Sequence, residues 1–121
     1  MGLSVKVGSF AQPGAIGNQS ISGVGFQPKI IFFFMNQLTA DGNGAGAASM
    51  FGVAVSSTDR RVAMNTIGDG LGTSDAARTH DDSKCIRFTS LTPANLCAAD
   101  FVSHDADGFT INWTAVDAAA R

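Results

Sequence analysis

The sequence predicts an all-β fold, an antiparallel β-sandwich of seven or eight short strands, of which the jelly roll is one form. Three observations lead to this prediction. Apolar and polar residues alternate in several short segments, turn-forming clusters separate these segments, and no segment carries a 3.6-residue apolar stripe of helical length. The chain has 121 residues, which suits a single domain (1–121) whose core needs neither a metal nor a disulfide.

Two short strands are predicted near the N-terminus. Leu3, Val5 and Val7 alternate with polar residues or glycine, which is the period of a strand with one buried face. Turn-forming residues follow over 13–18, and 19–24 is predicted to form the next strand.

The most apolar stretch lies in GVGFQPKIIFFFMNQ, where Ile30 to Met35 has no polar side chain. It is far shorter than the roughly 18 apolar residues of a membrane-spanning helix. It is also too short for an independent helix, and its aromatic and β-branched residues favour a strand. We expect both faces of this strand to be covered, by a second sheet or by another subunit. Its candidate interface residues are Ile30, Phe32 and Phe34.

The middle of the chain predicts two strands, Met50 to Ser56 and Arg61 to Ile67. Each is flanked by a segment rich in glycine and small or polar residues, 36–49 and 68–83, and both segments are predicted to be loops. Alternation in the first of the two strands places three apolar side chains on one face, namely Phe51, Val53 and Val55.

The C-terminal part predicts a strand over 85–91, a second over 97–103 and a hairpin. Its turn signal is DADG at 105–108, with Asp-Gly at its centre. The residues after the turn alternate in the strand period, which predicts a final strand with three core side chains, Phe109, Ile111 and Trp113.

Charge and composition exclude some functions. The net charge is −2, and the eight Lys and Arg residues are scattered along the chain. Nucleic-acid binding requires clustered basic residues, so no nucleic-acid partner is expected, and the lack of a long apolar segment predicts no membrane partner.

Aspartates in tight turns are the candidate metal ligands. Calcium prefers several oxygen ligands presented by loops, and the sequence offers Asp105, Asp107 and Asp41 in glycine-containing turns. Neither turn has the register or the closing Glu of an EF-hand. Turn geometry is the favoured interpretation of these residues, so no cofactor is expected and calcium stays the alternative.

Catalytic machinery is not predicted. The string THDDS at 79–83 brings His80 close in sequence to two carboxylates and a serine, but chain neighbours seldom face one way and no nucleophile motif is present. Phe109 and Trp113 are interpreted as core rather than as a sugar-stacking site. Cys85 and Cys97 are interpreted as buried thiols, with a disulfide as the alternative. The sequence thus predicts that the protein is not an enzyme.

Two segments carry a family resemblance. GNQSISGVGFQPKIIFFF at 17–34 and DFVSHDADGFTINWTAVDAAAR at 100–121 resemble a family of small proteins of tailed bacteriophages and prophages. The shared features are a Gly-Phe-x-Pro-Lys motif before an apolar strand and a late Asp-Gly-Phe-Thr-x-Asn-Trp hairpin. The resemblance implies a β-sandwich that serves as a virion or tail-associated structural component, and it brings no catalytic residue with it.

The chain departs from that family at one place. Members continue past the Ala-rich segment into another apolar strand, whereas Arg121 is the last residue here. Either the product is shortened or a neighbouring subunit supplies the strand.

From the residues and the resemblance we expect a non-enzymatic structural or assembly protein of a phage particle, a capsid decoration or tail-associated protein located in the virion. Its partners would be copies of itself and other virion proteins. The alternative is a glycan- or receptor-binding module on a phage tail. It would hold calcium in Asp-rich turns at 41–44, 80–82 and 104–107 gathered at one end, and a calcium-dependent rise in melting temperature would favour it.

Overall fold

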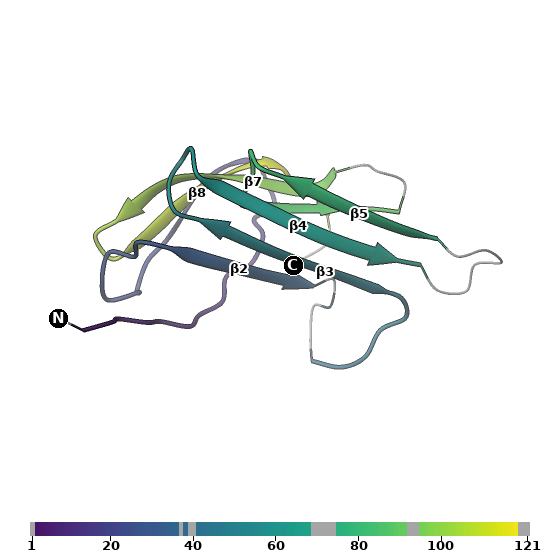
Figure 1. Cartoon of the computed structure of the whole chain (residues 1–121), viewed down its shortest axis with the longest axis horizontal. Coiled ribbons are helices and arrows are strands. Elements are labelled where there is room, and N and C mark those ends of the chain that lie inside the picture. The colour runs from purple at the N-terminus through teal and green to yellow at the C-terminus, as the bar shows by residue number, and fades with distance from the viewer. Residues whose placement is uncertain (1, 37, 39–40, 69–74, 92–94, 119–121) are drawn as a thin grey trace.

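The computed structural model describes residues 2–36, 38, 41–68, 75–91 and 95–118, and these form two antiparallel sheets packed face to face (Figure 1). Eight strands build them, four in each sheet, and the described residues contain no helix. The predicted all-β sandwich is therefore confirmed. The strands are β1 (Gly17–Ile21), β2 (Ile31–Asn36), β3 (Ala47–Ala54), β4 (Arg60–Ile67), β5 (Ala76–Asp81), β6 (Ile86–Thr89), β7 (Asn95–Asp105) and β8 (Gly108–Ala115).

The strand order is that of two meanders joined by crossings between the sheets. One sheet has the order β2-β3-β4-β5, and the other has the order β1-β8-β7-β6. The strands β2 to β5 and β6 to β8 follow one another as hairpins within their sheets, and β1 pairs with β8, whereas a jelly roll interleaves strands through two Greek keys. The jelly-roll form is wrong for this chain, because hairpin connections such as 55–59 and 106–107 keep β2 to β5 in one sheet and β6 to β8 in the other.

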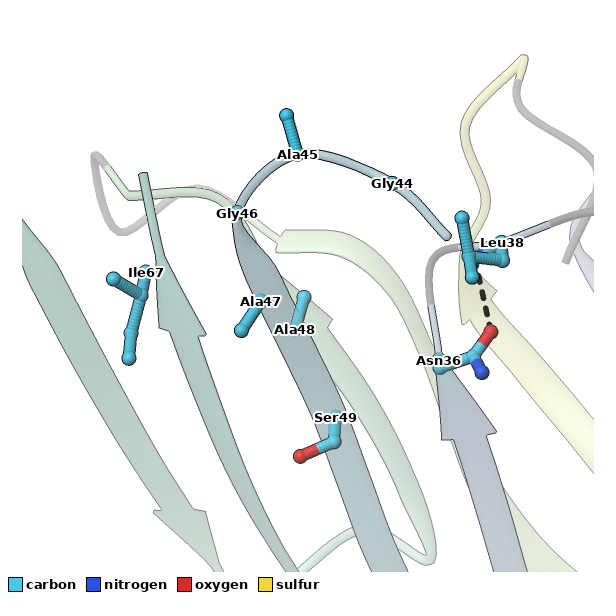
Figure 2. A pocket seen from close by; sticks show the side chains of 9 residues that line it. All are labelled: Asn36, Leu38, Gly44, Ala45, Gly46, Ala47, Ala48, Ser49 and Ile67. Atoms are coloured by element: carbon cyan, nitrogen blue, oxygen red, sulfur yellow. Dashed lines mark hydrogen bonds between the residues drawn. The ribbon is translucent and has the colours of Figure 1, made fainter. Parts of the chain in front are cut away.

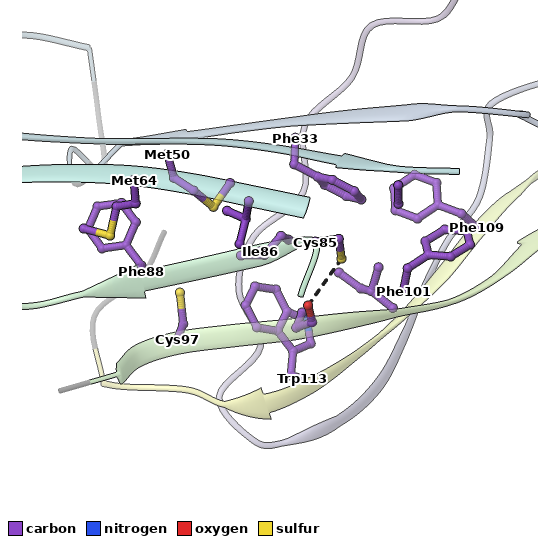
Figure 3. Close-up of a cluster of buried hydrophobic side chains, with 14 residues drawn as sticks. Phe33, Met50, Met64, Cys85, Ile86, Phe88, Cys97, Phe101, Phe109 and Trp113 are labelled. Carbon is purple, nitrogen blue, oxygen red and sulfur yellow. Dashed lines mark hydrogen bonds between the residues drawn. The ribbon is translucent and has the colours of Figure 1, made fainter. Parts of the chain in front are cut away.

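Alternation within the strands builds the core between the two sheets (Figure 3). Phe33 of β2 and Met50 of β3 face Phe88 of β6 and Trp113 of β8, and all four side chains are buried. The predicted inward phase of the last strand is confirmed, since Phe109, Ile111 and Trp113 are all buried. Phe109 and Trp113 are therefore core residues.

The sheets approach closely where β3 crosses the start of β6. Gly52 of β3 lies against the backbone of Cys85, and a Cβ at this glycine would overlap the Cys85 carbonyl oxygen. Close by, the β6 amides of Arg87 and Thr89 donate to the sulfurs of Met50 and Met64, at 3.4 and 3.0 Å. The missing side chain at Gly52 and the sulfur acceptors let this edge of one sheet rest directly on the other.

Several segments differ from the expectation. Residues 76–81, predicted to be loop, form β5 because their backbone pairs with β4, with Arg78 opposite Asn65. The loop predicted over 36–49 is shorter, since β2 includes Asn36 and β3 begins at Ala47. Leu3 to Val7, predicted to be a strand, is extended but pairs with no strand.

The apolar stretch at the start of β2 is a strand, as predicted, but the residues that the structure describes cover only one of its faces. β2 is an edge strand of its sheet rather than a central one. Phe33 points inward and is 4% exposed, whereas Phe32 and Phe34 are 63% and 79% exposed. No second sheet lies over their side because the four strands of the other sheet all pack on the inner face.

Candidate interaction surface

The outer face of the β2–β3 hairpin carries a cluster of exposed apolar side chains. Three rings belong to it: Phe34 lies opposite Phe51 across the ladder, and Phe32 contacts Phe51 diagonally. The ring centroids are 6.2 Å apart for Phe34–Phe51 and 5.9 Å apart for Phe32–Phe51. We call this cluster the outer aromatic patch and define it as Ile30, Phe32, Phe34, Phe51, Val53 and Val55, of which Val53 is half-buried and the others are exposed.

The local sequence explains why the patch forms. Successive residues of a strand point to opposite faces, so an unbroken run such as IFFFM must place apolar side chains outward as well as inward. The same holds for MFGVAV in β3, where Met50 is buried and Phe51 is half exposed. Since isolated exposed apolar residues are common but contiguous ones mark contact sites, this patch is the best candidate for a binding surface.

The patch ends where the sheet turns polar. Along the ladder that contains Ser49, the next outward residues are Asn65 on β4 and Arg78 on β5. His80 lies beyond Ala63 in the ladder that contains Phe51. A partner seated on the patch would therefore meet an apolar centre at β2 and β3. At β4 and β5 it would meet a mixed border, where the polar Asn65, Arg78 and His80 lie beside the apolar Ala63 and Ile67.

All three predicted interface residues lie in this patch, with Ile30 one residue before β2. Sequence reasoning missed the role of Phe51, Val53 and Val55. It placed them correctly on one face, but it did not assign that face to the outside. Alternation alone does not show which of the two faces of a strand points to the core. In β3 the residues in between, Met50, Gly52 and Ala54, are the ones that face the core.

The two turn aspartates have local partners. Asp107 accepts hydrogen bonds from the amides of Gly23 and Gly25 at 2.9 and 2.6 Å, and these bonds lower its pKa. Asp105 accepts from the hydroxyls of Thr110 and Ser103 at 2.6 and 2.7 Å, which lowers its pKa likewise. The carboxylates thereby hold the β7–β8 turn to the segment after β1 and to its own strands.

The third candidate ligand lies at the other end of the molecule. Asp41 belongs to the connection between the end of β2 and the start of β3. The β7–β8 turn lies at the opposite end, beside the β3–β4 turn, where His104 Nε2 hydrogen-bonds the Val55 carbonyl at 2.7 Å (Figure 1). Asp105 and Asp107 therefore lie at one end of the molecule, each with its own hydrogen-bond partners, and Asp41 lies at the other end. Among the described residues, no three His, Cys, Asp or Glu side chains gather as a metal site would require.

The THDDS string is split by the strand that it enters. His80 is exposed on the outer face of β5, whereas Asp81 points to the other side and pairs with Arg87 of β6. Ser83 donates both its amide, at 2.8 Å, and its hydroxyl, at 2.7 Å, to Asp81. Partial burial acts to raise the pKa of Asp81, but the bonds from Ser83 and Arg87 outweigh it and lower the pKa. The serine and the histidine thus do not face one another.

A shallow pocket of about 270 Å³ lies beside the segment that leads into β3 (Figure 2). Small side chains and glycines line most of it, together with Leu38 and Ile67. Asn36 is its main polar group, but its side-chain oxygen already accepts the Leu38 amide at 2.9 Å. Ligand sites usually have about 300 to 1,000 Å³ and several converging polar groups, so this pocket makes a weak small-molecule site.

The two cysteines are buried and free, as the favoured interpretation predicted. Burial raises the pKa of the Cys85 thiol to about 12, and its sulfur donates to the Ala99 carbonyl at 3.4 Å. Since the thiolate is the nucleophilic form, Cys85 is a packing residue.

Comparison with known proteins finds no relative: no protein-family model, curated protein or solved structure matches the chain. Within the described residues there is also no helix with the length and apolar character needed to cross a bilayer. The outer aromatic patch therefore remains the feature from which function is best argued.

Proposed function

We propose that this chain is a non-enzymatic structural component of a bacteriophage particle that acts through self-association and contacts with other virion proteins. The observation that carries the proposal is the outer aromatic patch, in which the rings of Phe32 and Phe34 both contact Phe51 and all three rings are exposed on an edge hairpin. The resemblance of the segments 17–34 and 100–121 to small phage proteins supplies the setting.

Burial of the patch would contribute substantially to assembly. Aromatic side chains each bury about 150–250 Å² when fully covered, and apolar burial is worth about 25 cal/mol per Å² before the costs of association. Aromatic residues are also enriched among the side chains that dominate interface energetics. A repeating contact of this kind suits a protein that is present in many copies.

The test is the assembly state of the purified protein. At micromolar concentration, we expect negative-stain microscopy and light scattering to detect discrete oligomers or regular arrays. Replacing both Phe32 and Phe34 by serine should shift the population toward monomer with little change in melting temperature, because both side chains lie outside the core.

The matched control is Val102→Ser, which removes an exposed apolar side chain from β7 in the other sheet. This variant should assemble like the parent protein. A monodisperse wild-type monomer at micromolar concentration, or equal loss of assembly in the control, would contradict the proposal.

A further inference from the structure

An N-terminal arm, residues 2–9, extends from the sandwich, and none of the described strands pairs with it (Figure 1). Every residue of the arm is exposed, including Leu3 at 91% and Val7 at 88%. Such exposure is unusual for apolar residues that alternate in the strand period, because that pattern belongs to a strand with one covered face. The arm therefore has the sequence of a strand but lacks a sheet to join.

An unpaired sheet edge lies in the same molecule. β2 bonds to β3 on one side only, and no described backbone group bonds to its other side. A free strand edge presents a row of N–H and C=O groups that can accept another strand. Natural proteins often protect such edges with charge or proline, yet the six residues of β2 contain neither.

The arm and the edge match in length and in pattern. The strand-like part of the arm, Leu3 to Val7, would span roughly 17 Å as a strand and β2 roughly 20 Å. The arm carries apolar residues at three alternate positions. So does the β2 segment if Ile30, just before the strand, is included, and so does the β3 segment if Val55, just after it, is included. One added strand would give three parallel rows: Leu3, Val5 and Val7; Ile30, Phe32 and Phe34; Phe51, Val53 and Val55.

The root of the arm is fixed. Phe10 packs edge-to-face on Phe33 and Phe109, with ring centroids 6.4 and 6.0 Å away, and Gln19 Nε2 bonds the Ala11 carbonyl at 3.1 Å. Residues 2–13 contain no turn or bend, and Gly8 is not among the glycines with positive φ. The chain thus runs outward from Phe10 without a reversal that would lay the arm on its own β2.

We infer that the arm of one copy adds as a strand to the β2 edge of a second copy, and that the two copies exchange arms reciprocally. The exchange would close a dimer and extend the outer aromatic patch by one apolar row. The inference rests on the proposed self-association and names its mode.

Two proline variants test the strand pairing. In an added strand, alternate amides point to the partner edge, so proline is tolerated at one position and disruptive at the next. Of Ser4→Pro and Val5→Pro, one should raise the dissociation constant of the dimer about tenfold or more, and the other much less. Trp113 fluorescence should show an unchanged fold in both, because the arm lies outside the core.

Disulfide trapping tests which copy is joined. A tagged Val5→Cys chain is mixed with an untagged Phe32→Cys chain and oxidised, and a linked pair of tagged and untagged chains is expected. Val5 and Phe32 are the centres of their rows, so they meet whether the arm runs parallel or antiparallel to β2. The double variant V5C/F32C, diluted below the dissociation constant, should stay unlinked.

Each outcome of these experiments either supports or overturns arm exchange. An internal link in the diluted double variant, equal effects of the two prolines, or no linked pair would overturn arm exchange. If oligomers persist in both proline variants but are lost when Phe32 and Phe34 become serine, the proposed function stands and only the arm exchange fails. A wild-type monomer overturns both.

Discussion

The two faces of the β2–β3 hairpin are built from the same kinds of residue but meet different surroundings. On the inner face, Phe33 packs edge-to-face on Phe109, with ring centroids 5.7 Å apart, and Gly52 touches the backbone of Cys85. On the outer face, the rings of Phe32 and Phe34 each contact Phe51 and no other ring among the described residues. Apolar character therefore does not tell which face forms the core; the inner face is the core because the second sheet lies on it.

The contrast also separates stability from association. Side chains on the inner face contribute to folding of a single chain, since water is already excluded from them. Those on the outer face can contribute the same kind of free energy only when another molecule covers them. Substitutions on the two faces should thus affect different measurements.

The largest effect is expected from Gly52→Val. The new side chain would overlap the Cys85 carbonyl, a backbone group that cannot swing aside. We expect a loss of at least about 4 kcal/mol in the free energy of unfolding, enough to unfold many domains, measured by urea titration followed through Trp113 fluorescence.

The control for this prediction is Gly14→Ala. No atom lies within 4 Å of a Cβ there, and its φ is not in the left-handed region. It should change stability by less than about 0.5 kcal/mol. A stable Gly52→Val protein with native spectra would mean that the sheets are not held this closely.

A smaller effect is expected from truncating one ring on each face. Phe33→Ala should cost about 3–4 kcal/mol, because it empties a buried site. Phe34→Ala should cost less than about 1 kcal/mol in the monomer, since it loses mainly the contact with Phe51. Thermal and urea unfolding at low protein concentration measure both; equal losses would show that the outer face is covered within one chain.

The smallest effect is expected at the β7–β8 turn, which carries Asp105 and Asp107. The folded-state pKa values of Asp105 and Asp107 lie below the ordinary 3.8. Their contribution to stability is then fully present above the ordinary pKa and is lost as the pH falls through the lowered values. Stability should decline between about pH 5 and pH 2, as measured by urea unfolding at several pH values.

Asp107→Asn should make that decline shallower, because the amide carries no charge for Gly23 and Gly25 to stabilise. Asp82→Asn is the comparison, since the Asp82 carboxylate holds no hydrogen bond among the described residues. An identical pH profile in wild type and Asp107→Asn would refute the role given to this carboxylate.

The sequence predicts the strands that have an apolar face and misses β5, which has none. Phe109, Ile111 and Trp113 could be placed in the core because alternation fixes their phase and the Asp-Gly turn fixes where the strand starts. β5 could not be found, because AARTHD has no apolar row and becomes a strand only through pairing with β4.

The opposite error occurs where the pattern is strong but the partner is missing. Leu3, Val5 and Val7 have strand alternation, yet the described fold pairs them with nothing. Pairing is a property of the neighbours as much as of the segment, so a local pattern predicts a capacity to form a strand rather than its use. Ile30, Phe32 and Phe34 could be named as candidate interface residues from the sequence because they lie in one dense apolar run, whereas Phe51 lies beside them only through the β2–β3 register.

The state of Cys85 has a consequence for where the protein can work. Its sulfur is enclosed between the sheets and stays protonated at neutral pH. The described fold contains no disulfide, since Cys85 and Cys97 are both free. Folding therefore needs no disulfide formation. The covalent structure of the chain would be the same in a reducing cytosol and in an oxidising exterior.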